Sequence, residues 1–177
     1  MEYRNIEGFE NEYPGKKFPF FRTLSNEEMS GIRFRIKKLI GLSEKSDNLE
    51  LVEALASTTK ICADFDADSD SFSLQECLKQ KKIHVTEHLL INFYRFDEID
   101  ELRADDVYEC FESLWYAGSD DIDLFDKTLS WMLSISHDGE VSVRHFNHIM
   151  GLSYTEICSH KATEAQRKET ALLSVFV

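Results

Sequence analysis

Apolar residues recur at helical spacing along most of the chain, and this periodicity limits the folds open to it more than any other feature. "SNEE" (25–28) has the S-x-x-E form of a capping box, in which the serine and the glutamate satisfy the first backbone N–H groups of a helix. An apolar stripe follows it, up to Gly41: Met29, Ile32, Ile36, Leu39 and Ile40. The pattern predicts an amphipathic helix over residues 25–40.

Similar stripes predict further helices along the chain. We expect them over 49–59, from the "SLQE" cap (73–76) onward, over 86–96, over 105–114 and over 119–133. "VSVRHFNHIM" (141–150) and "TEAQRKETALLSVF" (163–176) complete the set, while residues 1–24, which hold both prolines, are expected to be an extended or irregular lead-in. The sequence therefore predicts an all-α protein, a single globular domain over 1–177 with roughly seven to nine helices.

Composition is consistent with a globular, intracellular protein. With 177 residues, 42% of them hydrophobic, the chain can bury a core without metal or disulfides. No window has the length and apolar character of a membrane span or an export signal. The four cysteines, Cys62, Cys77, Cys110 and Cys158, are widely spaced without a C-x-x-C pair, which favours reduced thiols. We therefore expect a cytoplasmic protein with no membrane association.

Two stretches each resemble half of a calcium-binding EF-hand loop. "DFDADSDSF" (64–72) offers aspartates at the first four ligand positions, but Gln75 stands where a bidentate glutamate is needed. "SISHDGEVSVRHF" (134–146) has an Asp-Gly turn and ends its loop at His145. Neither stretch completes the ligand set, so we predict no metal site and interpret the aspartates as part of an anionic surface.

Signs of catalysis are weak. "HVTEH" (84–88) has the H-x-x-E-H form in which two histidines one helical turn apart bind zinc, but Thr86 also looks like a helix cap, which would leave His84 outside the helix. The seven glycines form no phosphate-binding loop, and no nucleophile motif is present. We predict that the protein is not an enzyme and uses no cofactor.

The strongest signal is a concentration of acid. The formal net charge is −13, which argues against nucleic-acid binding. Between Asp97 and Asp126 there are twelve carboxylates against Arg103 alone. Like charges this close repel one another, so such a patch costs stability unless salt screens it or a cationic partner meets it. A solvated face kept acidic for solubility is the alternative interpretation.

Helical geometry predicts which way some of these carboxylates face. At 100° per residue, the apolar stripe of the 105–114 helix lies opposite Asp105, Glu109, Glu112 and Tyr116. A tyrosine among outward carboxylates is typical of an interface, where the ring supplies buried area and the acids steer the partner. The predicted partner-binding residues are Asp105, Glu109, Glu112, Tyr116, Asp120, Asp121, Asp123 and Asp126.

The segment "RFDEIDELRADDVYECFESLWYAGSDDIDLFD" (95–126) gives the chain a resemblance to bacterial toxin-immunity proteins of the contact-dependent growth inhibition type. The resemblance is one of type: a small acidic protein with a concentrated carboxylate face. It implies a basic protein partner, a nuclease toxin domain, whose active site or substrate groove the protein covers. The alternative is a regulatory or adaptor protein built on degenerate EF-hand-like helix pairs. The sequence does not give an oligomeric state.

Overall fold

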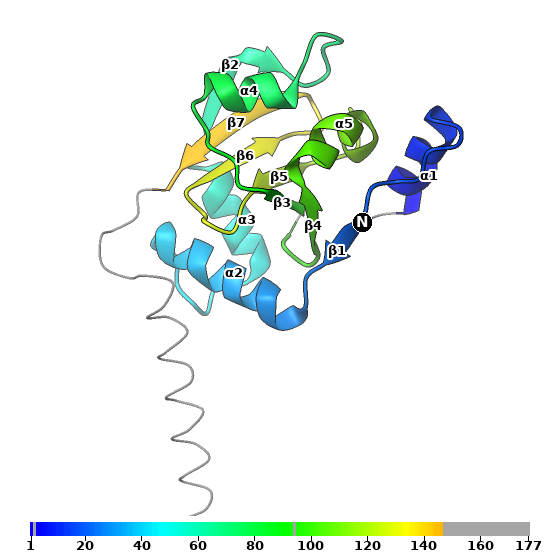
Figure 1. Ribbon diagram of the computed structural model, residues 1–177. Coiled ribbons are helices and arrows are strands. Elements are labelled where there is room, and N and C mark those ends of the chain that lie inside the picture. The colour runs from blue at the N-terminus through cyan, green and yellow to red at the C-terminus, as the bar shows by residue number, and fades with distance from the viewer. Residues whose placement is uncertain (2, 94, 147–177) are drawn as a thin grey trace, which may run out of the picture. The chain divides into compact units, whose positions relative to one another are not determined.

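Both helices and strands occur along the chain in the computed structural model, which describes residues 1, 3–93 and 95–146 (Figure 1). The helices are α1 (Tyr3–Glu12), α2 (Asn26–Leu39), α3 (Asn48–Ala56), α4 (Leu74–Gln80) and α5 (Ala104–Leu114). The strands are β1 (Phe21–Thr23), β2 (Lys60–Asp66), β3 (His88–Asn92), β4 (Ile99–Arg103), β5 (Ile122–Phe125), β6 (Trp131–Ile135) and β7 (Glu140–His145).

The seven strands form one sheet in the order β1-β4-β3-β5-β6-β7-β2. Each neighbouring pair is antiparallel. Register in the centre aligns Leu90 with Phe125 and Phe125 with Met132. The short β1 and the longer β2 form the two edges.

Helices cover both faces of the sheet and create two cores. Leu89 and Ile91 point to one face, where they pack with buried residues of α1, α4 and α5. Leu90 points to the other face and packs with buried residues of α2 and α3. Figure 1 shows α4 and α5 on one side of the sheet and α2 and α3 on the other. The described residues therefore form three layers, helices on sheet on helices.

The all-α prediction is wrong, and the three-layer arrangement explains the error. A strand buried on both faces reads as a continuous apolar run instead of an alternating one, and such a run also matches helical spacing. The predicted 86–96 helix is strand β3 and the chain after it: Leu89 enters one core, whereas Leu90 and Phe96 enter the other. The predicted 119–133 helix is the β5–β6 hairpin for the same reason.

The two helix predictions that rested on an S-x-x-E cap are confirmed, whereas the helix predicted from a Thr86 cap is wrong because residues 88–92 form β3. The Ser25 side chain and Glu28 form both halves of the capping box at α2. Ser73 caps α4, accepting from the Glu76 N–H at 3.3 Å. The predicted stripe of α5 is buried, with Val107 and Leu114 fully inaccessible.

The ends of the chain differ from expectation. The lead-in 1–24 contains helix α1 and strand β1, so it is not irregular throughout. The start of "VSVRHFNHIM" is strand β7, not a helix. The predicted 163–176 helix lies outside the described residues, and so does the C-terminal part of the predicted single domain over 1–177.

Candidate partner-binding surface

Helix α5 presents the acid that the sequence analysis placed outward. Its apolar face is fixed in the core, so Asp105, Glu109 and Glu112 are exposed on the opposite side. Arg103 lies 3.9 Å from the Asp105 carboxylate, but both side chains are largely solvated. Among the described residues, Glu109 and Glu112 form no ion pair. These carboxylates are therefore available to a cationic partner.

Helix α1 packs beside α5 and extends this acidic region. Asn5 is fully buried, and its Nδ2 donates to the carbonyls of Ser113 and Leu114 at 2.9 and 3.2 Å. The packing brings Glu12 and Tyr13 toward Glu112: both carboxylates raise the pKa of Tyr13, Glu12 more strongly. Sequence reasoning missed α1 because both prolines lie in the segment, although Ile6, Phe9 and Tyr13 are helically spaced.

We call the combined region the α1–α5 surface, and its residues are Glu12, Tyr13, Asp105, Glu109, Glu112 and Tyr116. The carboxylates are exposed and the two tyrosines are half-buried. Two cations lie beside these residues: Lys16, whose ammonium is 5.1 Å from the centre of the Tyr13 ring, and Arg103, which is 3.9 Å from the Asp105 carboxylate. The surface thus combines aromatic area with an excess of negative charge, as interfaces with basic proteins do.

Tyr116 belongs to this surface but is not a freely projecting anchor. Its hydroxyl lies against Gly8 of α1, and its backbone N–H donates to Asp120 Oδ2 at 3.1 Å. Burial and the nearby Glu12 raise the pKa of the phenol. Tyr116 therefore joins α1 to α5 and offers only part of its ring to a partner.

Two predicted site residues are buried and stabilise loops. Asp120 is 4% exposed; it pairs with Arg4, and its backbone carbonyl accepts from Trp115 Nε1 at 2.8 Å. Asp126 is inaccessible, and its carboxylate accepts from the N–H groups of Thr86 and Thr128 at 3.3 and 2.9 Å. Neither carboxylate is free for a partner.

The remaining two predicted residues lie apart from α5 in different ways. Asp121 is exposed and accepts from the His137 backbone N–H at 2.8 Å, with the His137 ring Nδ1 2.9 Å away. This hydrogen bond, together with the charges of Asp138 and Asp121, raises the pKa of His137. Asp121 remains compatible with a solvent-facing role.

Asp123 points to the other face of the sheet from α5. Its strand neighbours Ile122 and Leu124 pack in the α5 core, and side chains alternate along a strand. Asn92 Nδ2 and Ser134 Oγ donate to its two oxygens at 2.8 and 2.5 Å. Burial raises the pKa of this carboxyl despite the two hydrogen bonds. The structure thus assembles only part of the predicted set on one face.

The two EF-hand-like stretches lie side by side without forming helix pairs. Asp66 ends strand β2 and pairs with Glu140 of β7, and Ala67 N–H donates to the Gly139 carbonyl at 2.8 Å. Asp138-Gly139 is the turn of the β6–β7 hairpin. The EF-hand arrangement of helix, loop and helix is absent at both stretches.

The histidines of "HVTEH" also lack the geometry of a zinc site. His84 lies in non-helical chain and His88 begins β3, so they are not one helical turn apart. Across residues 1, 3–93 and 95–146, no group of three or more His, Cys, Asp or Glu side chains could hold a metal ion. Within the same residues, no helix is both long and apolar enough to cross a membrane.

Comparison with known proteins adds no family to this description. No family model, curated protein or solved structure matches the chain. The fold and the surface define a three-layer α/β/α protein with an acidic two-helix face.

Proposed function

We propose that this protein binds a basic protein through the α1–α5 surface, and that it acts as an immunity protein in the cytoplasm. In this role it covers the active site or substrate groove of a cognate nuclease toxin. The proposal is one of binding without catalysis, with no cofactor and no nucleic-acid ligand.

One observation carries the proposal: Asp105, Glu109 and Glu112 are exposed together on a helix whose other face is fixed in the core. Because the buried face anchors the backbone of α5, which is kinked at Cys110 between Glu109 and Glu112, binding requires ordering of the acidic side chains but not of the helix backbone. Their mutual repulsion is relieved when a cationic surface approaches.

The position of α1 supports the same function. Glu12 adds negative charge beside Glu112, and the half-buried rings of Tyr13 and Tyr116 add aromatic area between the helices. A nuclease groove is basic because it must hold phosphates. Carboxylates on one helix face can occupy such a groove in place of phosphates, as the resemblance to immunity proteins implies.

The alternative adaptor function rested on two EF-hand-like helix pairs. Its structural basis is missing, since the two stretches form the neighbouring ends of β2 and the β6–β7 hairpin. We therefore propose no second function.

A protection assay tests the proposal. The polypeptide encoded directly upstream would be expressed inducibly in a host cell, alone and with this protein. We expect a growth arrest that wild-type protein relieves and that a variant with Asp105→Asn, Glu109→Gln and Glu112→Gln relieves less well.

A matched control carries Glu27→Gln, Glu44→Gln and Glu53→Gln, three exposed acids of α2, α3 and the loop between them. It changes net charge equally and should protect fully. A toxic upstream product that neither wild type nor control relieves would contradict the proposed function.

A further inference from the structure

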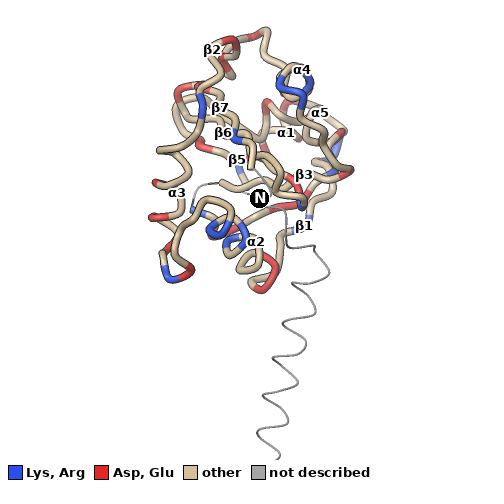
Figure 2. The backbone as a smooth tube through the Cα atoms, turned by 90° about the vertical axis from the view of Figure 1, so that its left-hand side faces the viewer, with Lys and Arg blue, Asp and Glu red and all other residues tan. Residues whose placement is uncertain are grey.

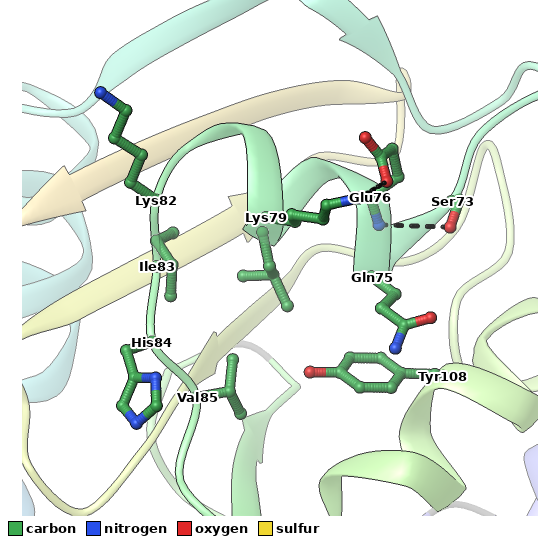
Figure 3. A pocket seen from close by; sticks show the side chains of 10 residues that line it. Ser73, Gln75, Glu76, Lys79, Lys82, Ile83, His84, Val85 and Tyr108 are labelled. Atoms are coloured by element: carbon green, nitrogen blue, oxygen red, sulfur yellow. Dashed lines mark hydrogen bonds and ion pairs between the residues drawn. The ribbon is translucent and has the colours of Figure 1, made fainter.

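A pocket of about 570 Å³ lies between α4, the chain at 82–85 and Tyr108 of α5 (Figure 3). Its volume is within the range of about 300–1,000 Å³ that is usual for sites that bind small molecules. The pocket is open to solvent, and its lining shares no residue with the α1–α5 surface, although Asp105 of that surface lies near the lining residue Tyr108.

Local sequence creates the pocket. Helix α4 ends at Gln80, and Lys82 adopts a left-handed conformation with φ of 56°, which turns the chain back. The Ile83 N–H then donates to the Leu78 carbonyl at 2.9 Å. The reversal places Ile83 and Val85 beside Leu78, and these three aliphatic side chains line the pocket with Tyr108. Figure 3 shows the Tyr108 hydroxyl directed toward Val85.

Three polar side chains around this apolar lining have no hydrogen-bond partner among the described residues. Gln75, His84 and Tyr108 make no side-chain hydrogen bond to any residue that the structure describes, and all three line the pocket. Figure 3 shows the Gln75 amide beside the Tyr108 ring. Tyr108 is half-buried, and burial, then the charge of Asp105, raises the pKa of its phenol. The amide and the phenol are positioned to donate to a ligand.

The pocket is locally basic in a chain of net charge −13. Lys79 and Lys82 line it with one carboxylate, Glu76, and the charge of Asp105 also reaches the lining residue Tyr108. The blue segment at α4 in Figure 2 marks this concentration of lysine. Acidic groups elsewhere are screened beyond about 8 Å at physiological ionic strength, so local charge dominates.

The lysines can serve a ligand. Lys79 pairs with Glu76 at 3.3 Å, but both side chains are largely exposed. Such surface pairs contribute about 0–1 kcal/mol, so an incoming anion can compete with Glu76 for the ammonium. Lys82 forms no ion pair within residues 1, 3–93 and 95–146. Figure 3 shows its side chain extended away from the lining, so it contributes charge at the rim.

We propose that this pocket binds a small organic anion, a planar ring that carries a carboxylate or a phosphate. The ring packs on Leu78, Ile83 and Val85 against the edge of Tyr108. The anionic group accepts from Lys79, with Lys82 adding charge, and Gln75 or the Tyr108 hydroxyl orients it. This proposal does not depend on the function of the α1–α5 surface.

Titration of the full chain with phenyl phosphate tests the site. Amide chemical shifts would be followed by NMR for the wild type and for Lys79→Gln with Lys82→Gln. The matched control is Lys38→Gln with Lys45→Gln, two exposed lysines of α2 and the loop after it. Benzamide serves as the neutral probe and inorganic phosphate as the anion without a ring.

We expect saturable shifts at residues 75–85 and at Tyr108. The Lys79/Lys82 variant should bind phenyl phosphate at least about fivefold more weakly than wild type, and the control variant should bind it as tightly as wild type. The wild type should bind benzamide and inorganic phosphate at least about fivefold more weakly than phenyl phosphate. Tyr108→Phe keeps the ring and should weaken binding without loss of folding. Shifts that do not saturate, that lie elsewhere, or that are equal for benzamide and phenyl phosphate would overturn the proposal.

Discussion

The hydroxyl of Tyr116 lies against the backbone of Gly8, where a Cβ atom would stand 2.4 Å from the phenolic oxygen. Glycine is thus favoured in the middle of α1 by a tyrosine that follows the C-terminal end of α5. The contact fixes the side of α1 that faces α5, and with it the place of Glu12 on the α1–α5 surface.

We predict that Gly8→Ala destabilises the protein, although alanine is the better helix former by about 1 kcal/mol. The added methyl must displace a half-buried ring, and overpacking of this kind costs about 1–3 kcal/mol. Tyr116→Phe removes the phenolic oxygen that would clash with the added methyl group, so the Gly8→Ala/Tyr116→Phe double variant should regain stability. Urea unfolding measures both; a stabilised Gly8→Ala single variant would show that the contact is not tight.

Asp126 and Asp121 should differ sharply when replaced by alanine. Asp126→Ala removes a buried carboxylate that accepts from the N–H groups of Thr86 and Thr128, and we expect the loss to cost about 1.5–3 kcal/mol for each hydrogen bond to the charged group. Asp121→Ala removes an exposed pair with the His137 ring and the exposed hydrogen bond from the His137 backbone N–H, which water can replace, so we expect a loss of about 1 kcal/mol or less. Thermal unfolding of the two variants measures their stabilities. Similar losses of stability in both would refute the division into structural and surface carboxylates.

Asp123 should make stability depend on pH. Its folded-state pKa is raised, so the native state favours the protonated form. The resulting stabilisation is complete below the unfolded pKa of about 3.9 and is lost as pH rises through the folded value. Asp123→Asn keeps a neutral group that can bond Asn92 and Ser134. We predict that the variant gains stability relative to wild type as pH rises from about 4 to 7; a constant difference would be inconsistent with this.

The cores should protect two cysteines from alkylation. Burial raises the pKa of Cys77 to about 11 and that of Cys110 to about 12, so the reactive thiolate is scarce at neutral pH. We predict that iodoacetamide leaves both unmodified in native protein at pH 7.5 and modifies both in urea, as peptide mass mapping would show. Rapid labelling of Cys110 in the native protein would mean that α5 detaches transiently from the sheet. The acidic surface that α5 carries would then not be fixed in place.

Sequence patterns located the helices that carry local signals. Ser25 and Ser73 cap helices through contacts within four residues, and the stripe of α5 faces a single core. The strands carry no such signal, because Leu89 and Leu90 are adjacent in sequence yet serve opposite cores. Their pairing partners are distant in the chain, so only the fold reveals the sheet.

The candidate surface was predictable in part for the same reason. Asp105, Glu109 and Glu112 follow from helical geometry alone, whereas Asp123 was placed with them only because its strand was interpreted as a helix. Asp120 looked solvated because Arg4, its partner, is 116 positions away. Charge density in a sequence does not separate a solvated carboxylate from one buried with a distant cation.

The most direct test of the central claim is the rate at which the protein associates with the toxin that the protection assay identifies. Stopped-flow measurements would compare wild type, the Asp105→Asn/Glu109→Gln/Glu112→Gln variant and the Glu27→Gln/Glu44→Gln/Glu53→Gln control over a range of salt concentrations. Exposed charges act mainly on association and are screened by salt. We predict that the α5 variant associates at least about tenfold more slowly at low salt, that the difference narrows as salt is raised, and that the control behaves as wild type. Equal association rates for the two triple variants at every salt concentration would contradict the claim that α5 faces the partner.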